Sequence, residues 1–210
     1  MSFYFSAQNI HKTFESKTIS FSIECDKGTL TSLVGPSGSG KSTVLKIISG
    51  LEKNDDDYPL EIVLDGKRIE KLSPSKRGIG MIFQSGALFE NMNVVENVAF
   101  GLMSHGESRK EALRKASEFL GEFGLSGFDK RNPVSLSGGE RQRVALARTL
   151  ITSPDLVLMD EPLSALDAEL RYKLGQQMRL WQKEIGFTAI MVTHDKSEAE
   201  RMSDRIVSII

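Results

Sequence analysis

The sequence predicts an α/β fold with a mainly parallel sheet and one helical insertion. Short, unbroken apolar runs such as 156–159 and 189–192 are typical of strands that are buried on both faces. Between such runs, apolar residues recur at helical spacing, and strands that alternate with helices favour a mainly parallel sheet. The stretch from about 85 to 153 contains no convincing strand, so we expect it to form a helical insertion.

The individual elements follow from the strand and helix periodicities of the apolar residues. Residues 18–24 alternate apolar and polar, which indicates a half-buried strand. The predicted strands cover 18–24, 30–34, 61–65, 79–83, 156–159, 189–193 and 206–210. The predicted helices cover 42–51, the segment behind a capping-box pattern at Ser108 and Glu111, and a segment from about 167 with the stripe Leu170, Leu174, Met178, Trp181 and Ile185.

The composition is that of a globular protein without a basic excess. Hydrophobic residues make up 40% and charged residues 26% of the 210 residues, which argues against disorder and allows a sizeable core. The 27 basic and 28 acidic residues give a net charge of -1, so nucleic acid is not an expected partner. The single cysteine, Cys25, excludes an intrachain disulfide and is compatible with a reducing cytosol.

The distribution of apolar residues argues against a membrane span. No segment approaches the ~18 uninterrupted apolar residues that a spanning helix needs. The N-terminus has neither a basic segment nor a long apolar one, so it does not predict a secretion signal. We therefore expect a soluble, cytoplasmic protein that reaches a membrane only through a partner.

A phosphate-binding loop is predicted between the strand 30–34 and the helix 42–51. The residues Gly35, Pro36, Ser37, Gly38, Ser39, Gly40, Lys41 and Ser42 match G-x-x-x-x-G-K-[ST] in full. Glycines let successive N–H groups face one anion, Lys41 supplies a positive charge for the β- and γ-phosphates, and the Ser42 hydroxyl can bind Mg²⁺. The alternative is a glycine-rich turn without a ligand, and the flanking strand and helix argue against it.

Two acids follow the apolar run 156–159. At the end of such a strand Asp160 could hold Mg²⁺ through water, and the adjacent Glu161 could polarise an attacking water. Taken without the glycine loop, the pair could equally be an exposed acidic pair at a strand end.

Polar residues also end two other predicted strands. His194 follows 189–193 and Gln84 follows 79–83, and polar residues at such strand ends usually face the ligand crevice of an α/β sheet. Taken singly, each is more often structural.

A second anion-binding helix end is predicted at residues 136–143. Ser137 and two glycines precede a helical pattern, which leaves bare N–H groups at a helix N-terminus. One nucleotide already has its phosphates cradled by the first loop, so this second helix end suggests a site built between two molecules. An ordinary helix cap with glycines would give the same spacing.

In their order along the chain, these motifs resemble those of the ATP-binding subunit of an ABC transporter, of the importer kind. Residues 35–42 resemble the Walker A motif, Gln84 the Q-loop glutamine, 136–142 the signature motif, 156–160 Walker B with Glu161 as the catalytic carboxylate, 164–167 the D-loop and His194 the switch histidine. The resemblance covers nearly the whole chain, and the signature just ahead of Walker B is close to diagnostic of the family.

The resemblance implies a phosphate-loop NTPase core of the RecA-like kind, with a mainly parallel sheet, an antiparallel β edge and a helical insertion. The chain would be a single ATP-binding domain with its core at 1–84 and 154–210 and its insertion at about 85–153. ATP and Mg²⁺ would be its ligands. The implied catalytic residues are Lys41, Gln84, Glu161 and His194, the implied metal ligands are Ser42, Gln84 and Asp160, and the implied nucleotide contacts are Phe14, Gly35, Pro36, Ser37, Gly38, Ser39, Gly40, Lys41, Ser42, Thr43, Ser137, Gly138 and Gly139.

Two positions depart from the usual family pattern. Glu140 stands in the signature where glutamine is more common. Phe14 falls nearest to the aromatic that stacks on adenine, often a tyrosine; phenylalanine keeps the π-face and loses only the hydroxyl. A phenylalanine at a strand edge could equally be a core residue.

The resemblance further implies that two copies, as a homodimer or with a second ATP-binding subunit, enclose two ATP molecules and open after hydrolysis. Gln84 would link the γ-phosphate to the insertion, which would dock on membrane-embedded permease subunits. An extracytoplasmic solute-binding protein would belong to the same system. The subunit would then be peripheral on the inner face of the cell membrane. Because the chain ends at Ile210, just after the last predicted strand, we do not expect regulation through a further C-terminal domain.

Import is favoured over three alternatives. The segments 77–84, 87–89 and 95–98 resemble prokaryotic importers of the sugar, polyamine, sulfate, iron and thiamine groups. Some exporters and lipoprotein-release systems have similar separate subunits. A soluble ABC ATPase acting on ribosomes or DNA usually has two ATP-binding halves or a coiled coil, and this chain has neither. A regulator without turnover is disfavoured by the presence of both Glu161 and His194.

Overall fold

The computed structural model describes residues 3–15 and 17–209, and the chain divides into two compact units. The first unit contains Met1–Met81, Asp155–Glu161 and Gly175–Ile210. The second contains Ile82–Pro154 and Pro162–Leu174, and the predicted insertion lies inside the first of these two segments. Within the described ranges, no helix is both long and apolar enough to span a membrane.

The first unit contains a five-stranded sheet. Its spatial order is β6 (Ile79–Ile82), β7 (Leu156–Asp160), β8 (Ala189–Thr193), β3 (Leu30–Val34) and β9 (Arg205–Ser208). β8 pairs in parallel with β7 and with β3, and β3 pairs in parallel with β9. The three central strands are buried almost throughout. This confirms the prediction made from the unbroken apolar runs of β7 and β8, whereas β3 is buried although it contains the polar residues Thr31 and Ser32. Helix α6 (Lys196–Met202) packs on β3 and β8.

Four antiparallel strands form a sheet of their own. Its order is β2 (Lys17–Cys25), β1 (Phe5–Phe14), β4 (Glu61–Leu64) and β5 (Lys67–Arg68). The strand β1 has no counterpart among the predicted strands. Its register with β2 shifts between Ala7 and Ile10, and Asn9 there has a positive φ of 60°. This bulge interrupts the alternation of buried residues, and the periodicity that would have revealed the strand is lost.

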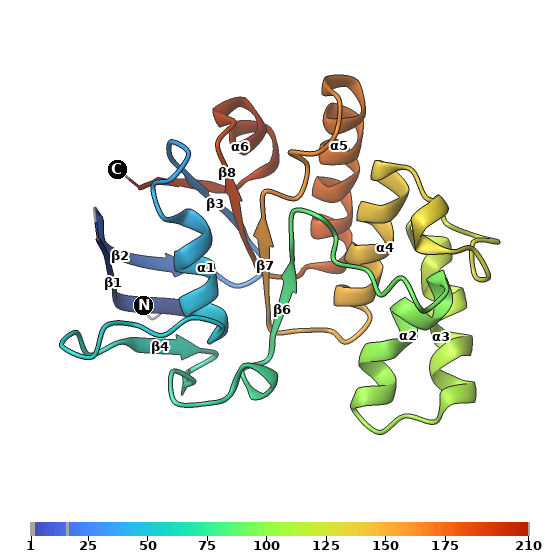
Figure 1. Cartoon of the computed structure of the whole chain (residues 1–210), viewed down its shortest axis with the longest axis horizontal. Helices are drawn as coiled ribbons and strands as arrows, with labels where there is room; N and C mark the ends of the chain where they lie inside the picture. The colour runs from blue at the N-terminus through green and yellow to red at the C-terminus, as the bar shows by residue number, and fades with distance from the viewer. Residues whose placement is uncertain (1–2, 16, 210) are drawn as a thin grey trace. The chain divides into compact units, whose positions relative to one another are not determined.

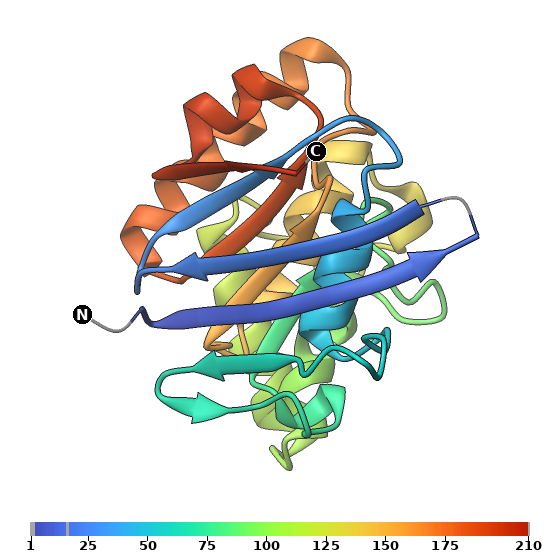
Figure 2. The same cartoon turned by 90° about the vertical axis from the view of Figure 1, so that its left-hand side faces the viewer.

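Helix α1 (Lys41–Ser49) lies between the two sheets of the first unit, as Figures 1 and 2 show. Its buried residues join side chains of β1, β2, β3, β4, β7 and β8 in one apolar core. The helix ends two residues earlier than its apolar spacing predicts. Because the N–H of Leu51 bonds the carbonyl of Lys46, Leu51 leaves the helix and is 53% exposed, so the predicted helix end at residue 51 is wrong.

The second unit is helical over its first segment, as predicted. It contains α2 (Val94–Ser104), α3 (Arg109–Glu122) and α4 (Gly138–Leu150), and these three helices pack together (Figure 1). Ser108 caps α3 by accepting the N–H of Glu111, while the Glu111 carboxylate bonds Arg114, so only half of the predicted capping box forms. The apolar stripe of α3 is buried at Ala112, Ala116 and Leu120.

Helix α5 (Ala168–Ile185) contributes its first seven residues to the second unit and the rest to the first. Leu174 and Met178 of its predicted stripe are buried. Ile185, the last residue of the helix and of the predicted stripe, is 44% exposed. The last turn of a helix can extend beyond the core on which the preceding turns pack. Helical periodicity alone does not show where this happens.

Arg77 fixes the C-terminal end of the helix that follows the phosphate loop. It is 7% exposed, and its Nη1 donates to the carbonyls of Ile47 (3.1 Å) and Ile48 (2.7 Å) in α1. Its Nε and Nη2 donate to the carbonyls of Leu72 (3.0 Å) and Glu70 (2.8 Å). The last carbonyls of a helix have no partner within the helix, so this guanidinium satisfies them and offsets the negative end of the helix dipole.

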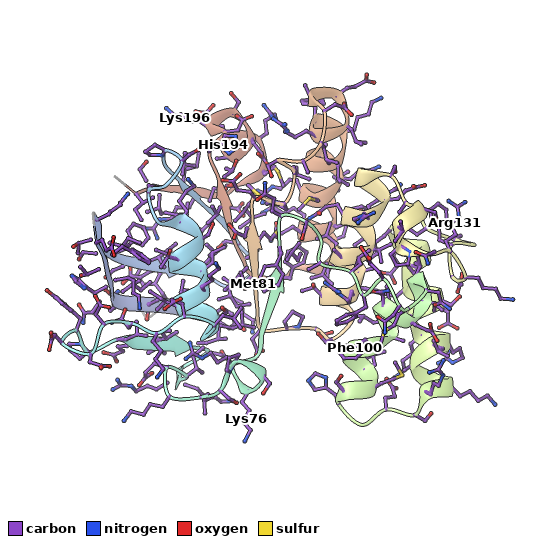
Figure 3. All side chains as sticks on the ribbon, viewed as in Figure 1. Lys76, Met81, Phe100, Arg131, His194 and Lys196 are labelled. Carbon is purple, nitrogen blue, oxygen red and sulfur yellow. The ribbon has the colours of Figure 1, made fainter. Side chains whose placement is uncertain are left out.

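An Arg77→Met variant is expected to be destabilised by about 3 kcal/mol, because it leaves several buried carbonyls without donors. Burial lowers the pKa of Arg77 and the Glu70 carboxylate opposes that shift. Urea unfolding followed by circular dichroism measures the difference. Lys76→Met is the matched control, since Lys76 is exposed and projects away from the ribbon in Figure 3. Equal stability of the two variants would contradict the capping role.

Candidate functional site

A cavity of about 270 Å³ lies in the first unit beside the phosphate loop. The strands β3, β7 and β8 run parallel, so the residues after their carboxyl ends meet at one edge of the sheet. The residues that line the cavity are Phe14, Lys17, Ile19, Ser37, Gly38, Gly40, Lys41, Ser42, Thr43 and Glu161. Seven of the predicted nucleotide contacts and the predicted catalytic carboxylate are therefore in one place.

The phosphate loop has the conformation that an anion site needs. Gly40, the residue before α1, has a φ of 98° and offers no side-chain cap. The first N–H groups of α1, at Lys41, Ser42 and Thr43, are therefore left for a ligand. A Cβ at Gly40 would stand 2.2 Å from Cδ1 of Ile19, so both the backbone angle and the packing require glycine there.

Lys41 is 4% exposed, and its ammonium is folded onto its own loop. The Nζ donates to the carbonyls of Gly35 (2.9 Å) and Pro36 (2.8 Å). Among the described residues, no carboxylate lies within 4.0 Å of this ammonium. A buried cation held only by neutral carbonyls is suited to exchange them for an anionic phosphate oxygen.

The structure brings together two of the three predicted metal ligands. The Ser42 hydroxyl, on the first turn of α1, donates to Oδ1 of Asp160 at the end of β7 (2.7 Å). A hydroxyl and a carboxylate are hard oxygen donors of the kind that Mg²⁺ prefers beside phosphate oxygens and water. In the described part of the chain, no cluster of three or more histidine, cysteine, aspartate or glutamate side chains could hold a metal ion. The residues thus fit a magnesium ion that shares its coordination with a nucleotide.

Glu161 and His194 are paired although they lie 33 residues apart in the chain. Nδ1 of His194 is 3.1 Å from Oε2 of Glu161. His194 lies where β8 ends (Figure 3). Glu161 has a left-handed backbone with φ 46°, which a non-glycine residue adopts at a cost of roughly 1–3 kcal/mol. Its N–H bonds the carbonyl of Val192 (3.0 Å), which holds this conformation next to β8. With this backbone conformation, Glu161 lines the cavity.

The hairpin of β1 and β2 supplies the rest of the cavity wall. Phe14 is the last residue of β1 and is 47% exposed, so it is not a core residue, and it borders the cavity. Lys17 and Ile19 of β2 also line the cavity, and neither is among the predicted site residues. Neither belongs to a motif, and only the strand pairing brings them to the phosphate loop.

The predicted second helix end is the N-terminus of α4 in the second unit. Ser137 caps α4 by accepting the N–H of Glu140 (3.3 Å), and Oε2 of Glu140 accepts the N–H of Ser137 (2.8 Å). The Ser137 hydroxyl also donates to Oε2 of Glu140 (2.8 Å), and these two donors of Ser137, its N–H first, lower the pKa of Glu140. Glutamate and glutamine both complete such a capping box, so the departure at this position keeps the helix end intact.

The two glycines of the signature allow the side chains of Leu166 and Leu170 to approach the start of α4 closely. A Cβ at Gly138 would stand 2.8 Å from Cδ2 of Leu166, and one at Gly139 would stand 3.1 Å from Cδ2 of Leu170. Leu166 belongs to the predicted D-loop, 164–167, whose Asp167 accepts the N–H of Leu170 (3.0 Å). Signature and D-loop are thus packed together within the second unit.

The remaining predicted site residues are placed as follows. Gln84 lies in the second unit, exposed in the turn that follows β6. Gly35, Pro36 and Ser39 belong to the phosphate loop but do not line the cavity wall, and Ser39 is buried. The roles assigned to these residues stay predictions.

Comparison with known proteins assigns a family. The model of the ABC transporter family matches residues 17–164. An Fe(3+) ions import ATP-binding protein of Agrobacterium fabrum is 46% identical over 202 residues, which are 95% of this chain and 56% of that protein. A sulfate/thiosulfate import ATP-binding protein of Nocardia farcinica is 47% identical over 184 residues, 88% of this chain and 55% of that protein. The chain thus spans about half the length of the curated relatives it matches.

A solved structure has the same fold over nearly its whole length. It is the dimeric, post-hydrolysis state of an ATP-binding cassette bound to ADP and Pi. The TM-score is 0.82 at 32% identity, and the match covers 98% of this chain and 94% of that one. This confirms the predicted α/β fold with its parallel sheet, antiparallel strands and helices. By the matching family model and by this likeness, the chain belongs to the ABC transporter family, whose ATP-binding domain it contains.

Proposed function

We propose that the chain hydrolyses ATP and thereby powers the import of a solute by an ABC transporter. One observation carries the proposal: a phosphate loop with a buried lysine that bonds only carbonyls among the described residues, the Ser42–Asp160 pair and the Glu161–His194 pair come together around one edge of the parallel sheet. The first two can hold the phosphates of a nucleotide with its metal ion. The third can direct a water molecule at the terminal phosphate. The two compact units would together form a single ATP-binding domain.

In this proposal the phosphates bind to the N–H groups at the start of α1. Lys41 leaves the carbonyls of Gly35 and Pro36 and bonds the β- and γ-phosphate oxygens. Ser42 and Asp160 would hold Mg²⁺, with Gln84 proposed as a further ligand, and the metal would neutralise part of the phosphate charge. Phe14 offers its ring face to the adenine base.

Glu161 is the proposed partner of the attacking water. Its carboxylate accepts a hydrogen bond from the water and takes a proton as the water oxygen bonds to the γ-phosphorus. The bond from the γ-phosphorus to the bridging oxygen breaks, and ADP leaves with that electron pair. His194, bonded to Glu161 through Nδ1, would orient the carboxylate and contact the γ-phosphate through its other nitrogen.

The helix end at Ser137 is proposed to act on the nucleotide of a second copy. The capped N-terminus of α4, with Gly138 and Gly139, is suited to an anion, and a γ-phosphate between two copies would hold them together. The partner copy would be identical or a second ATP-binding subunit. The loss of the γ-phosphate would let the pair open, which is the motion that a transporter can use.

The partners and the location follow from this role. We propose that the second unit docks on membrane-embedded permease subunits, with Gln84 as the link to the γ-phosphate, so that the protein lies at the inner face of the cell membrane. A solute-binding protein would deliver the cargo. The named relatives import Fe(3+) ions and sulfate or thiosulfate, at 46% and 47% identity, so we propose an inorganic ion as the cargo class.

Phosphate release from ATP by the purified chain tests the proposal. We expect steady release with Mg²⁺ and its loss when EDTA removes the metal, because without a cation the Asp160 carboxylate would repel the phosphates. Restoring Mg²⁺ in excess of EDTA should restore the activity, which separates metal dependence from damage to the protein. No release at any Mg²⁺ concentration, by a protein with an intact circular dichroism spectrum, would contradict the proposed function.

A further inference from the structure

Lys17 stands beside the phosphate loop because the hairpin between β1 and β2 is short. Phe14 and Lys17 are partners in the strand register, and both line the cavity. The Nζ of Lys17 donates to the carbonyl of Gly38 in the phosphate loop (3.0 Å). A longer hairpin would carry a residue at this position away from the loop, so the pairing of Phe14 with Lys17 decides the contact.

The partner of this ammonium is a neutral carbonyl. In the described ranges no carboxylate lies within 4.0 Å of Lys17, and Glu161 is the one carboxylate that lines the cavity. Lys12, on the same hairpin, shows the usual alternative, because its Nζ is 3.0 Å from Glu52 and 3.8 Å from Asp55. Lys17 and Lys41 share the opposite arrangement: both bond carbonyls of the phosphate loop, and neither has an anionic partner among residues 3–15 and 17–209.

Two ammonium groups that point at one loop make the cavity suited to a polyphosphate. A charge-assisted bond to a phosphate oxygen is stronger than one to a neutral carbonyl, so a ligand with several negative charges would draw both lysines. The neighbours of Lys17 indicate which part of the ligand it meets. Phe14, directly across the hairpin, is the proposed platform for the base, and Gly38 lies in the loop that holds the phosphates. Lys17 stands between these two ends.

We propose that Lys17 is a second phosphate-binding lysine of this protein, which leaves the carbonyl of Gly38 and bonds the α- and β-phosphates of the nucleotide. The inference deepens the proposed function and rests on it. The division of labour is specific: Lys41 meets the β- and γ-phosphates, whereas Lys17 meets the part that ATP and ADP have in common. Lys17 therefore sets nucleotide affinity without distinguishing the triphosphate from the diphosphate.

Three variants separate a nucleotide contact from a structural one. Lys17→Gln keeps a donor for the carbonyl of Gly38 but removes the charge. Lys17→Arg keeps the charge. Lys12→Gln is the matched control, since it removes a charge from the same hairpin at a residue that does not line the cavity. Titration calorimetry with ADP, and with the nonhydrolysable analogue AMP-PNP, measures the affinities of each variant and of the wild type.

We expect Lys17→Gln to weaken the binding of ADP and of AMP-PNP alike, by about five- to tenfold, as one charged hydrogen bond is lost. Lys17→Arg should restore most of the affinity, and Lys12→Gln should bind as the wild type does. In steady-state hydrolysis, Lys17→Gln should raise KM more than it lowers kcat, because Lys17 would contact substrate and product alike. The wild type should also lose affinity with rising salt more steeply than Lys17→Gln does.

Wild-type affinity of Lys17→Gln for both nucleotides would overturn the inference and leave Lys17 as a tether of the loop. A loss confined to AMP-PNP would also overturn it, since it would place Lys17 at the γ-phosphate. Both results differ from a failure of the proposed function, in which the wild type itself would bind neither nucleotide and both proposals would fall.

Discussion

A Lys41→Ala variant is expected to lose ATP hydrolysis by about 10²–10³-fold and to bind ATP much more weakly. The ammonium of Lys41 is buried, is held by two carbonyls of its own loop and has no anionic partner within the described residues. It is therefore free to follow the phosphates as negative charge develops on the transferred group. Its removal leaves the N–H groups of α1 as donors but takes away the mobile cation. Phosphate release by the purified variant, together with its affinity for ATP, measures both effects.

Lys46→Ala is the matched control for this variant. Lys46 lies on the same helix, is exposed and does not line the cavity. It should hydrolyse ATP at close to the wild-type rate, and both variants should unfold at similar urea concentrations. A Lys41→Ala protein with near-normal turnover would show that the cavity beside the phosphate loop is not the site of hydrolysis.

A Glu161→Gln variant is expected to bind ATP, to hydrolyse it about 10²–10⁴-fold more slowly and to persist as a dimer. The amide keeps the shape of the carboxylate but cannot take the proton of the attacking water. It also removes a negative charge that faces the γ-phosphate, which favours closure of two copies around ATP. Size-exclusion chromatography with ATP and Mg²⁺ should show a dimer for this variant and mostly monomer for the wild type. The exposed Glu200 supplies the control, since Glu200→Gln should behave as the wild type.

A second substitution tests whether the dimer uses the N-terminus of α4. In the Glu161→Gln background, Ser137→Arg should restore the monomer, because it places bulk on the capped helix end proposed to face the partner's nucleotide. Ser126→Arg adds the same side chain at another exposed position of the second unit and should leave the dimer intact. A Glu161→Gln protein that stays monomeric in saturating ATP would contradict the two-copy site for the isolated chain.

Local patterns predicted most of the elements correctly, and the errors have identifiable causes. The central strands β7 and β8 are buried on both faces, so their apolar runs are unbroken and easily recognised. The strand β1 escaped recognition because its bulge shifts the period of two at Asn9. Leu51 was assigned to a helix and Ile185 to an apolar stripe because helical spacing does not mark where a helix ends or leaves its neighbours, and both residues are exposed.

In the candidate site, too, the parts built from consecutive residues are predictable from the sequence, and the parts built from distant segments are not. The phosphate loop is predictable because its glycines, its lysine and its serine are consecutive, and its shape depends on the backbone freedom of Gly40 and on the helix that starts there. The signature is predictable for the same reason, since Ser137 and Glu140 form their capping box within four residues.

The sequence by itself determined where most strands and several helices lie along the chain, the phosphate loop, the capped helix end and the residue types suited to phosphate and metal. Only the tertiary structure decided which of them meet. The parallel order of β7, β8 and β3 brings Ser42 to Asp160 across 118 residues and His194 to Glu161 across 33. The register of β1 with β2 carries Lys17 to Gly38. These contacts depend on sheet order and strand pairing between distant segments, and no local periodicity encodes them.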